Sequence, residues 1–224
     1  MNFETLAEMR AALAEAVGDV DPESSRGKKR LKILEAAIAL FVTHGYRKTS
    51  IDDIARAAGI AKGTVYLSFA TKLDVLYVAC ALEKLRLFAV LDGFDAPDLA
   101  PRDRLRQWVR ASILMVAASP LLTRASASDP DMLAALIEAM PERFAAAMAD
   151  AGGFIGHLLD AAVAPATWTA EERHARFVVL QALTRFAPLV RDDPLRQGLS
   201  VEQFADVLAD IVVDGVRVPD RSQA

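Results

Sequence analysis

The sequence is poor in the residues that most often carry chemistry. A single cysteine, Cys80, excludes an intrachain disulfide framework and a metal site built from cysteine pairs, and its apolar neighbours favour a packed thiol over a redox sensor. The three histidines, His44, His157 and His174, show no metal-ligand spacing, and the glycines form neither a P-loop nor a dinucleotide-binding fingerprint. We therefore expect no enzyme, no cofactor and no metal site.

The chain also lacks a long uninterrupted apolar run. None approaches the roughly 18 residues that a membrane-spanning helix needs, and the acidic, amphipathic N-terminal residues do not resemble a signal peptide. Hydrophobic residues nevertheless occupy 53% of the 224 positions, enough for a substantial core. These features predict a soluble, cytoplasmic protein of one or two domains.

One basic block stands out against an acidic background. Residues 26–72 contain ten Lys and Arg against three Asp and Glu, a net charge of +7, whereas the whole chain carries −4. A local excess of positive charge on a body that repels phosphate is typical of a nucleic-acid-binding surface.

Three helices are predicted within this block. The first has apolar residues at helical spacing and stops at Gly45, which suits a helix C-terminus. The second runs from Ile51 to Ala58, and either Thr49 or Ser50 could cap it with a carboxylate three residues later. A glycine then allows a tight turn before a third helix, residues 62–69. The apolar positions of the first helix are Leu31, Leu34, Ile38, Phe41 and Val42.

The third helix is expected to turn short polar groups outward. Val65 and Phe69 lie four residues apart and can pack inward together. The residues then left outside are Lys62, Thr64, Tyr66 and Ser68. This layout predicts a helix-turn-helix headpiece that binds duplex DNA; the alternative is a generic three-helix unit with a solvated basic face.

The joint spacing of these residues resembles the TetR family of transcriptional regulators over about Leu31 to Leu76. The matching positions are Ala36-Ala37, Phe41, Gly45-Tyr46, Thr49, Ile54-Ala55, Ala58-Gly59-Ile60, Lys62-Gly63-Thr64-Val65-Tyr66, Phe69 and Lys72. The resemblance implies that Thr49, Lys62, Thr64, Tyr66 and Lys72 contact DNA. Chemistry suits Lys72 and the Tyr66 hydroxyl to phosphates, and Lys62 and Thr64 to base edges or backbone.

Two positions depart from the family pattern. Ala61 stands where a serine commonly caps the third helix, and the missing cap costs about 1 kcal/mol. Ser68 stands where an aromatic residue or histidine is common. Operator preference therefore does not transfer from relatives.

Ahead of the headpiece, residues 1–25 form an acidic extension with a net charge of −5. Apolar residues fall on one helical face as far as Val17, and Gly18 ends the pattern. The extension could fold back on the headpiece, pack on the body or remain a mobile arm.

Residues 73–224 are helix-patterned nearly throughout. Proline and glycine divide them into helical segments, which we expect at 71–91, 101–119, 121–127, 169–190 and 200–216. A further helical segment begins at 129–130, and Pro141 interrupts it. Arg102, Arg106 and Arg110 share one side of their helix, where a solvated charged face is favoured over an anion site. The fold class is therefore all-α, a three-helix headpiece (26–72) joined to a helical effector-binding and dimerisation domain (73–224).

The resemblance implies an effector pocket inside this body. Flexible and aromatic side chains line apolar cavities well, although each also suits plain core packing. The candidates are Trp108, Met115, Leu136, Met140, Phe144, Met148 and His157.

A homodimer is expected because the helix around residues 169–190 is apolar nearly all round and needs cover on two sides. The final helix carries a matching stripe. The candidate interface residues are Phe177, Leu180, Phe204, Leu208 and Ile211.

Together these features predict a dimeric DNA-binding transcriptional regulator, with repression favoured. It would bind a pseudopalindromic operator and be released by a small, apolar effector. Two alternatives stay open: a regulator controlled by a protein partner instead of a small molecule, and a helical ligand-binding protein whose headpiece no longer binds DNA.

Overall fold

The computed structural model describes residues 5–91, 93–94, 96–125, 129–164, 168–186, 190–191 and 193–216. Within these ranges the chain forms helices joined by turns and contains no strand, which confirms the all-α class. No single helix in these ranges is long and apolar enough to cross a bilayer; only the bent pair formed by residues 62–68 and 72–87 meets that criterion, by length and composition alone.

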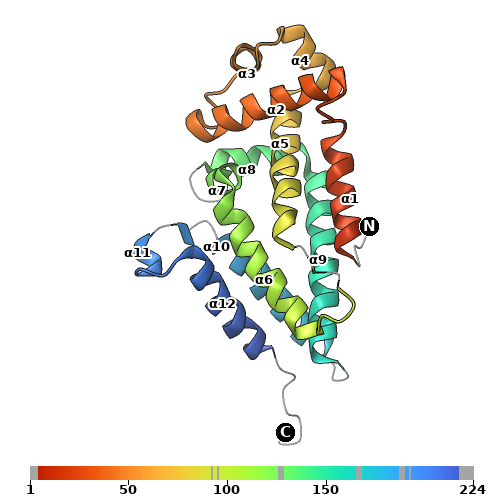
Figure 1. The fold of residues 1–224 in the computed structure, drawn as a ribbon, viewed down its shortest axis with the longest axis vertical. Coiled ribbons are helices and arrows are strands. Elements are labelled where there is room, and N and C mark those ends of the chain that lie inside the picture. Colours follow the sequence, from red (N-terminus) through yellow and green to blue (C-terminus); the bar gives the residue numbers. More distant parts are fainter. Residues whose placement is uncertain are drawn as a thin grey trace, which may run out of the picture. The chain divides into compact units, whose positions relative to one another are not determined.

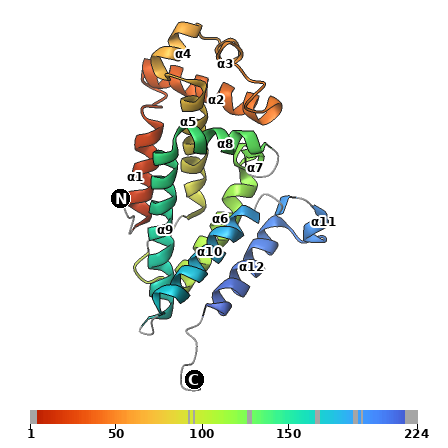
Figure 2. The ribbon, with the colours of Figure 1, turned by 180° about the vertical axis from the view of Figure 1, so that it is seen from behind.

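The helices follow one another as drawn in Figures 1 and 2. In chain order they are α1 (Leu6–Val17), α2 (Ser25–His44), α3 (Ile51–Ala58), α4 (Lys62–Ser68), α5 (Lys72–Leu87), the 3-10 turn η1 (Phe88–Leu91), α6 (Pro101–Ala118), α7 (Pro120–Thr123), α8 (Pro130–Ala139), α9 (Pro141–Val163), α10 (Ala170–Phe186), α11 (Asp193–Arg196) and α12 (Val201–Gly215).

Two compact units divide these helices. The headpiece unit holds residues 9–87 and 119–144, and the body unit holds residues 1–8, 88–118 and 145–224. The headpiece unit thus includes α5, α7 and α8 besides the three helices predicted from the basic block. The expected domain boundary at residue 72 remains a prediction.

One apolar core holds the headpiece unit together. It gathers side chains from α1 to α5 and from the α7–α8 segment, so that each helix buries one stripe. The fully buried members are Val17, Ile33, Leu34, Ala37, Phe41, Ile54, Val65, Val75, Leu76, Ala79, Leu121 and Met132. The Phe41 ring lies 5.9 Å from that of Tyr46, which anchors the α2–α3 loop on this core.

Local chemistry explains where α3 begins and ends. Ser50 accepts a hydrogen bond from the Asp53 backbone N–H, and the Asp53 carboxylate accepts one from the Ser50 N–H, which completes a capping box. Gly59 ends the helix in the left-handed conformation, at φ 65°, where a side chain would be strained. The predicted bounds of this helix are confirmed, and the cap is Ser50, not Thr49.

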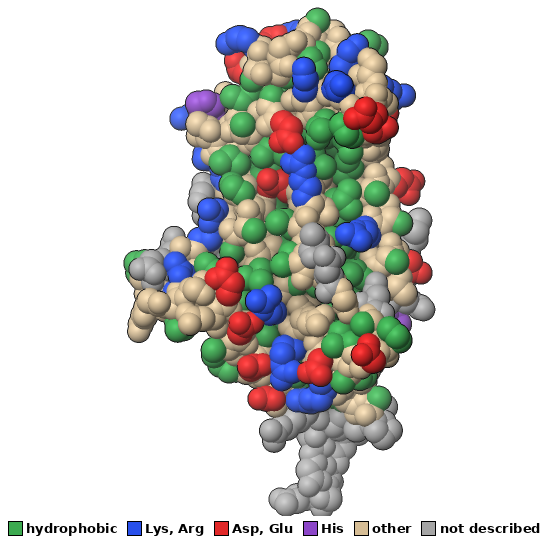
Figure 3. All heavy atoms as spheres, in the orientation of Figure 1, with side chains coloured by type: hydrophobic (Ala, Val, Ile, Leu, Met, Phe, Trp, Pro, Cys, Tyr) green, Lys and Arg blue, Asp and Glu red, His purple; other side chains and the backbone are tan. Residues whose placement is uncertain are grey.

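In the body unit, α6 packs lengthwise against α12. The three arginines of α6 reach across to aspartates of α12: Arg102 to Asp214 at 3.6 Å, Arg106 to Asp210 at 2.5 Å, and Arg110 to Asp206. Figure 3 shows Lys and Arg side chains beside Asp and Glu on this face. The arginines are partly exposed, so α6 has the expected charged face. Its arginines form ion pairs with α12 and thereby connect the two helices.

Two segments differ from the sequence interpretation, and the expected end of a third falls beyond residues outside the described ranges. The α-helix α5 stops at Leu87, because the following 3-10 turn brings Phe88 and Leu91 onto the same side, where both are buried. The segment expected at 121–127 is the short helix α7, started by Pro120 behind the Ser119 cap. The α-helix α10 ends at Phe186, and residues 187–189 lie outside the described ranges.

Candidate DNA-binding site

The outward face of α4 is open to solvent. Tyr66 is 49% exposed and Leu67 is 85% exposed, while Thr64 is half-buried and Val65 is completely buried. The predicted inward positions Val65 and Phe69 and the predicted outward positions Lys62 and Tyr66 are confirmed. Thr64 and Ser68, also predicted to face outward, are half-buried, and the exposure of Leu67 was not predicted. An exposed leucine on such a short helix is available for apolar contact, for example with a thymine methyl group.

Lys62 begins α4 and is tied to α3. Its ammonium lies 2.9 Å from the Asp52 carboxylate, and that hydrogen bond raises the pKa of Lys62. Both groups are about half exposed, so the pair contributes little to stability and can open when a phosphate or base edge competes. Ala61, the N-cap residue, makes no side-chain hydrogen bond, as its chemistry requires.

Thr49 lies inside the α2–α3 loop rather than on its surface. Its side chain is only 2% exposed, and its hydroxyl donates to the Gly45 carbonyl at 2.8 Å. A buried hydroxyl satisfied in this way stabilises the loop conformation. Direct contact of Thr49 with a phosphate would require this loop to rearrange.

Lys72, at the start of α5, holds the same loop from the other side. Its ammonium donates to the carbonyls of Tyr46 at 2.8 Å and Thr49 at 2.9 Å, and lies 4.2 Å from the centre of the Tyr46 ring. Partial burial lowers the pKa of Lys72 and raises that of the Tyr46 hydroxyl. Two of the three ammonium protons are thereby engaged, and this structural role was not predicted from the sequence.

The α7–α8 segment supplies a further support for this loop. The Asp129 carboxylate accepts a hydrogen bond from the Tyr46 N–H at 3.1 Å, and Arg124 donates to the Val42 carbonyl at 2.6 Å. A Cβ atom at Gly45 would meet the Asp129 carboxylate at 2.6 Å. More than 80 residues separate these partners in the sequence, so no local pattern could have indicated the contact.

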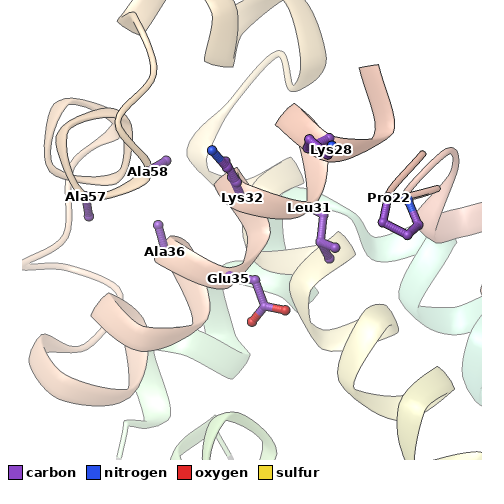
Figure 4. Close-up of a pocket in the computed structure, with 8 residues that line it drawn as sticks. All are labelled: Pro22, Lys28, Leu31, Lys32, Glu35, Ala36, Ala57 and Ala58. Atoms are coloured by element: carbon purple, nitrogen blue, oxygen red, sulfur yellow. The ribbon is translucent and has the colours of Figure 1, made fainter. Parts of the chain in front are cut away.

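The first two turns of α2 carry an exposed basic surface. Its members are Arg26, Lys28, Lys29 and Lys32. Between α2, α3 and the preceding loop lies a pocket of about 520 Å³, with Lys28, Lys32 and Glu35 at its edge and Pro22 at one end (Figure 4). The charge of the block predicted such a surface but not which residues would form it.

The candidate effector residues occupy varied environments. Trp108 is buried, and its ring centre lies 6.1 Å from that of Phe94 and 4.7 Å from that of Phe154, in the body unit. Met115, Leu136 and Met140 are half-buried and His157 is exposed. The side chains of Phe144 and Met148 lie outside the described parts. The shared pocket stays a prediction.

The candidate dimer residues lie on α10 and α12. Leu180 is buried, Phe177, Phe204 and Leu208 are half-buried, and Ile211 is 64% exposed. Neighbouring apolar side chains are exposed too: Val178 at 47%, Val179 at 58% and Val207 at 52%. A hollow of about 290 Å³ lies on these helices, with Val179, Leu180 and Ile211 in its lining.

Two short helices joined by a glycine turn, with the second helix presenting an exposed polar face, define a helix-turn-helix protein. Residues 33–77 match the domain described as "Bacterial regulatory proteins, tetR family". The chain is 31% identical to the transcriptional repressor KstR of Mycobacterium tuberculosis over 151 residues, which are 62% of this chain and 66% of that protein. The chain belongs to the TetR family.

Other relatives match shorter stretches of the chain. MftR of Mycobacterium tuberculosis, a transcriptional regulator associated by name with mycofactocin biosynthesis, is 36% identical over 96 residues, 41% of this chain and 46% of the relative. The aligned part thus spans between about half and two thirds of these two curated relatives.

Solved structures share the fold over most of the chain. A TetR-family regulatory protein from Rhodococcus RHA1 aligns with a TM-score of 0.63 at 21% identity, covering 86% of this chain and 99% of that one. FadR from Bacillus subtilis, solved in complex with stearoyl-CoA, aligns with a TM-score of 0.60 at 15% identity, covering 83% and 98%. At these identities the likeness concerns the fold alone.

Proposed function

We propose that this protein is a transcriptional repressor that binds a pseudopalindromic operator as a homodimer and leaves it when a small apolar effector binds. The observation that carries the proposal is the headpiece: a basic helix-turn-helix unit whose α4 exposes Lys62, Tyr66 and Leu67. Repression is supported by the name of the relative KstR.

The proposed roles in DNA binding follow from each side chain's surroundings. Lys62 and Thr64 face base edges or nearby backbone, and the Tyr66 hydroxyl and the free proton of the Lys72 ammonium serve phosphates. We assign Thr49 an indirect role, because its hydroxyl is buried and already donates to Gly45. Phosphate contacts fix the register of the headpiece, and α4 reads the sequence.

The dimer is supported by the apolar side chains that α10 and α12 leave exposed. Val178, Val179, Val207 and Ile211 are each between 47% and 64% exposed, and a second copy would remove them from water. A twofold axis would place two copies of α4 about 34–36 Å apart, in successive major grooves.

The effector site is proposed to lie in the body unit beside the cluster of Phe94, Trp108 and Phe154. Rings at centre distances of 4.7 to 6.1 Å form an apolar wall against which a hydrocarbon chain could lie. FadR, whose fold is similar, was solved with stearoyl-CoA, which makes acyl compounds the first class to test.

Selection of bound duplexes from a random pool tests DNA binding by the purified full chain. We expect enrichment of a palindrome whose affinity falls steeply with salt, because each phosphate contact contributes about 0.9 to the slope of log K against log salt. Sedimentation at the same concentrations should give a dimer. Failure to enrich any sequence, together with salt-insensitive affinity, would refute the DNA-binding proposal.

Tryptophan fluorescence tests the effector site. A Trp168→Phe variant leaves Trp108 as the only indole, since the chain has two tryptophans. Acyl compounds of increasing length should change its emission and release the operator over the same concentration range. A change in emission without release would refute control by this site, and release without a change would place the effector elsewhere.

A further inference from the structure

The acidic extension ahead of the headpiece is built into the headpiece core. Val17, the last residue of α1, is completely buried among side chains of α2 to α5, and Leu13, Ala16 and Val20 pack against the same core. Gly18 follows in a left-handed conformation, φ 70°, and its N–H closes α1 on the Ala14 carbonyl at 2.9 Å. The fold-back alternative for this end of the extension is therefore the one observed.

The loop that follows α1 fits tightly onto the start of α2. The Asp19 carboxylate accepts hydrogen bonds from the Asp21 N–H and the Ser24 hydroxyl, both at 3.0 Å, and these bonds lower the pKa of Asp19. A Cβ atom at Gly27 would lie 2.4 Å from the Asp21 carbonyl oxygen. Only glycine at position 27 admits the loop in this place.

Arg30 connects the end of α1 to the end of α4. Its Nε donates to the Val17 carbonyl at 2.9 Å, and one terminal nitrogen donates to the Ser68 carbonyl at 3.0 Å. The guanidinium also lies 4.3 Å from the centre of the Phe69 ring. Val17 and Ser68 are the last residues of their helices, whose final carbonyls lack partners within the helix. One side chain thus binds a terminal carbonyl at each of the two helix ends.

The helix α4 depends on contacts with its neighbours because it is short and buries little of its own surface. It has seven residues, Val65 is its only buried side chain, and Ala61 offers no cap. A helix this short is unstable in isolation, so its position depends on the contacts made at its ends.

We propose that Arg30 is a positioning residue through which the N-terminal extension sets the place of α4 for operator reading. The extension itself need not touch DNA. This inference rests on the proposed function and deepens it. It gives Arg30 and the N-terminal extension, which are not among the predicted DNA contacts, a part in discriminating between DNA sequences.

The prediction concerns discrimination between operator and unrelated duplex. Arg30→Lys keeps the positive charge, but one ammonium cannot keep the forked geometry that reaches both carbonyls. We expect operator affinity to fall about tenfold, the loss of roughly one charge-assisted hydrogen bond, while affinity for unrelated duplex and the salt slope stay unchanged. Gly27→Ala, which displaces the loop without changing charge, should act in the same direction.

Lys29→Gln is the matched control, because it removes an exposed charge one residue away. It should weaken operator and unrelated duplex alike, with a smaller salt slope if Lys29 meets a phosphate. An unchanged ratio of operator affinity to unrelated-duplex affinity in Arg30→Lys would show that Arg30 does not position α4. If Arg30→Gln weakened both affinities as Lys29→Gln does, Arg30 would be an ordinary phosphate contact. Either result would make the proposal wrong.

Amide hydrogen exchange without DNA separates this proposal from the function on which it rests. The Phe69 N–H, which donates to the Val65 carbonyl at 2.9 Å, reports opening of the last turn of α4. It should exchange about tenfold faster in Arg30→Lys, with circular dichroism confirming that the variant is folded. Unchanged exchange would overturn the proposal even if the parent bound DNA, and faster exchange would support the Arg30 connection even if the parent bound none.

Discussion

Replacing Lys72 with methionine should cost the headpiece much of its stability. The change removes two charge-assisted hydrogen bonds, to the carbonyls of Tyr46 and Thr49, and the contact with the Tyr46 ring. Such bonds contribute ~1.5 kcal/mol or more each, and the ring contact adds ~0.5 kcal/mol. Because Lys72 is only partly buried, water recovers some of this, and we expect a net loss of about 2 kcal/mol.

Urea unfolding of the DNA-free protein, at one protein concentration, measures this loss. The urea concentration at the midpoint of unfolding should fall. The slope of the free energy of unfolding against urea concentration should stay constant, because the surface exposed on unfolding does not change. Lys62→Met is the control, since its solvent-exposed ion pair with Asp52 should add little to stability. Equal stability of Lys72→Met and the parent would refute the loop-holding role.

The same variant tests the proposed phosphate contact independently. If the third ammonium proton of Lys72 meets a phosphate, the salt slope of operator binding should fall by about 0.9. Measurement at a temperature where both proteins are folded keeps stability out of the comparison. A weaker affinity with an unchanged slope would mean that Lys72 acts only by shaping the loop.

Three further changes test local features. Ala61→Ser should stabilise the protein by ~1 kcal/mol by capping α4, read as a higher melting temperature; no rise would mean that the uncapped N–H groups already have partners. Ser50→Ala should lower the free energy of unfolding in urea by ~1 kcal/mol. Hydrogen bonds from Ser50 lower the pKa of Asp53, so the parent should lose stability as the pH falls below 3.8. This loss should be smaller in Ser50→Ala. Burial raises the pKa of Cys80 from 9.0 to about 12, so the folded protein keeps a proton that the unfolded chain loses, and the free energy of unfolding should fall as pH rises above 9.0. Cys80→Ser should remove the part of that fall that the thiol causes and leave the part due to the raised pKa of Tyr46.

Features fixed by neighbours in the sequence could be predicted, and features fixed by distant partners could not. The bounds of α3 followed from a capping box and a glycine within ten residues. The division of α4 into inward and outward sides followed from helical spacing. In both cases the determining groups lie within one or two turns.

The supports of the α2–α3 loop and of α4 arise from tertiary contacts. Lys72 reaches carbonyls 23 and 26 residues away, Arg30 reaches Ser68 across 38, and Asp129 reaches Tyr46 across 83. A backbone carbonyl has no side-chain signature, so an arginine or lysine that binds one looks in the sequence like any surface charge. Sequence patterns therefore predict only a phosphate contact for Lys72 and only a positive charge for Arg30.

The separation between the two faces of α4 has a consequence for evolution and for engineering. Its inward side rests on Val65 and on the following Phe69, whereas Tyr66 and Leu67 are exposed and add little to folding. Substitutions at exposed positions usually change stability by ~0.5 kcal/mol or less. Under the proposed function, new operator preferences could therefore accumulate at the exposed positions Lys62 and Leu67 without compensating changes in the core. A library randomised there should yield mostly folded proteins.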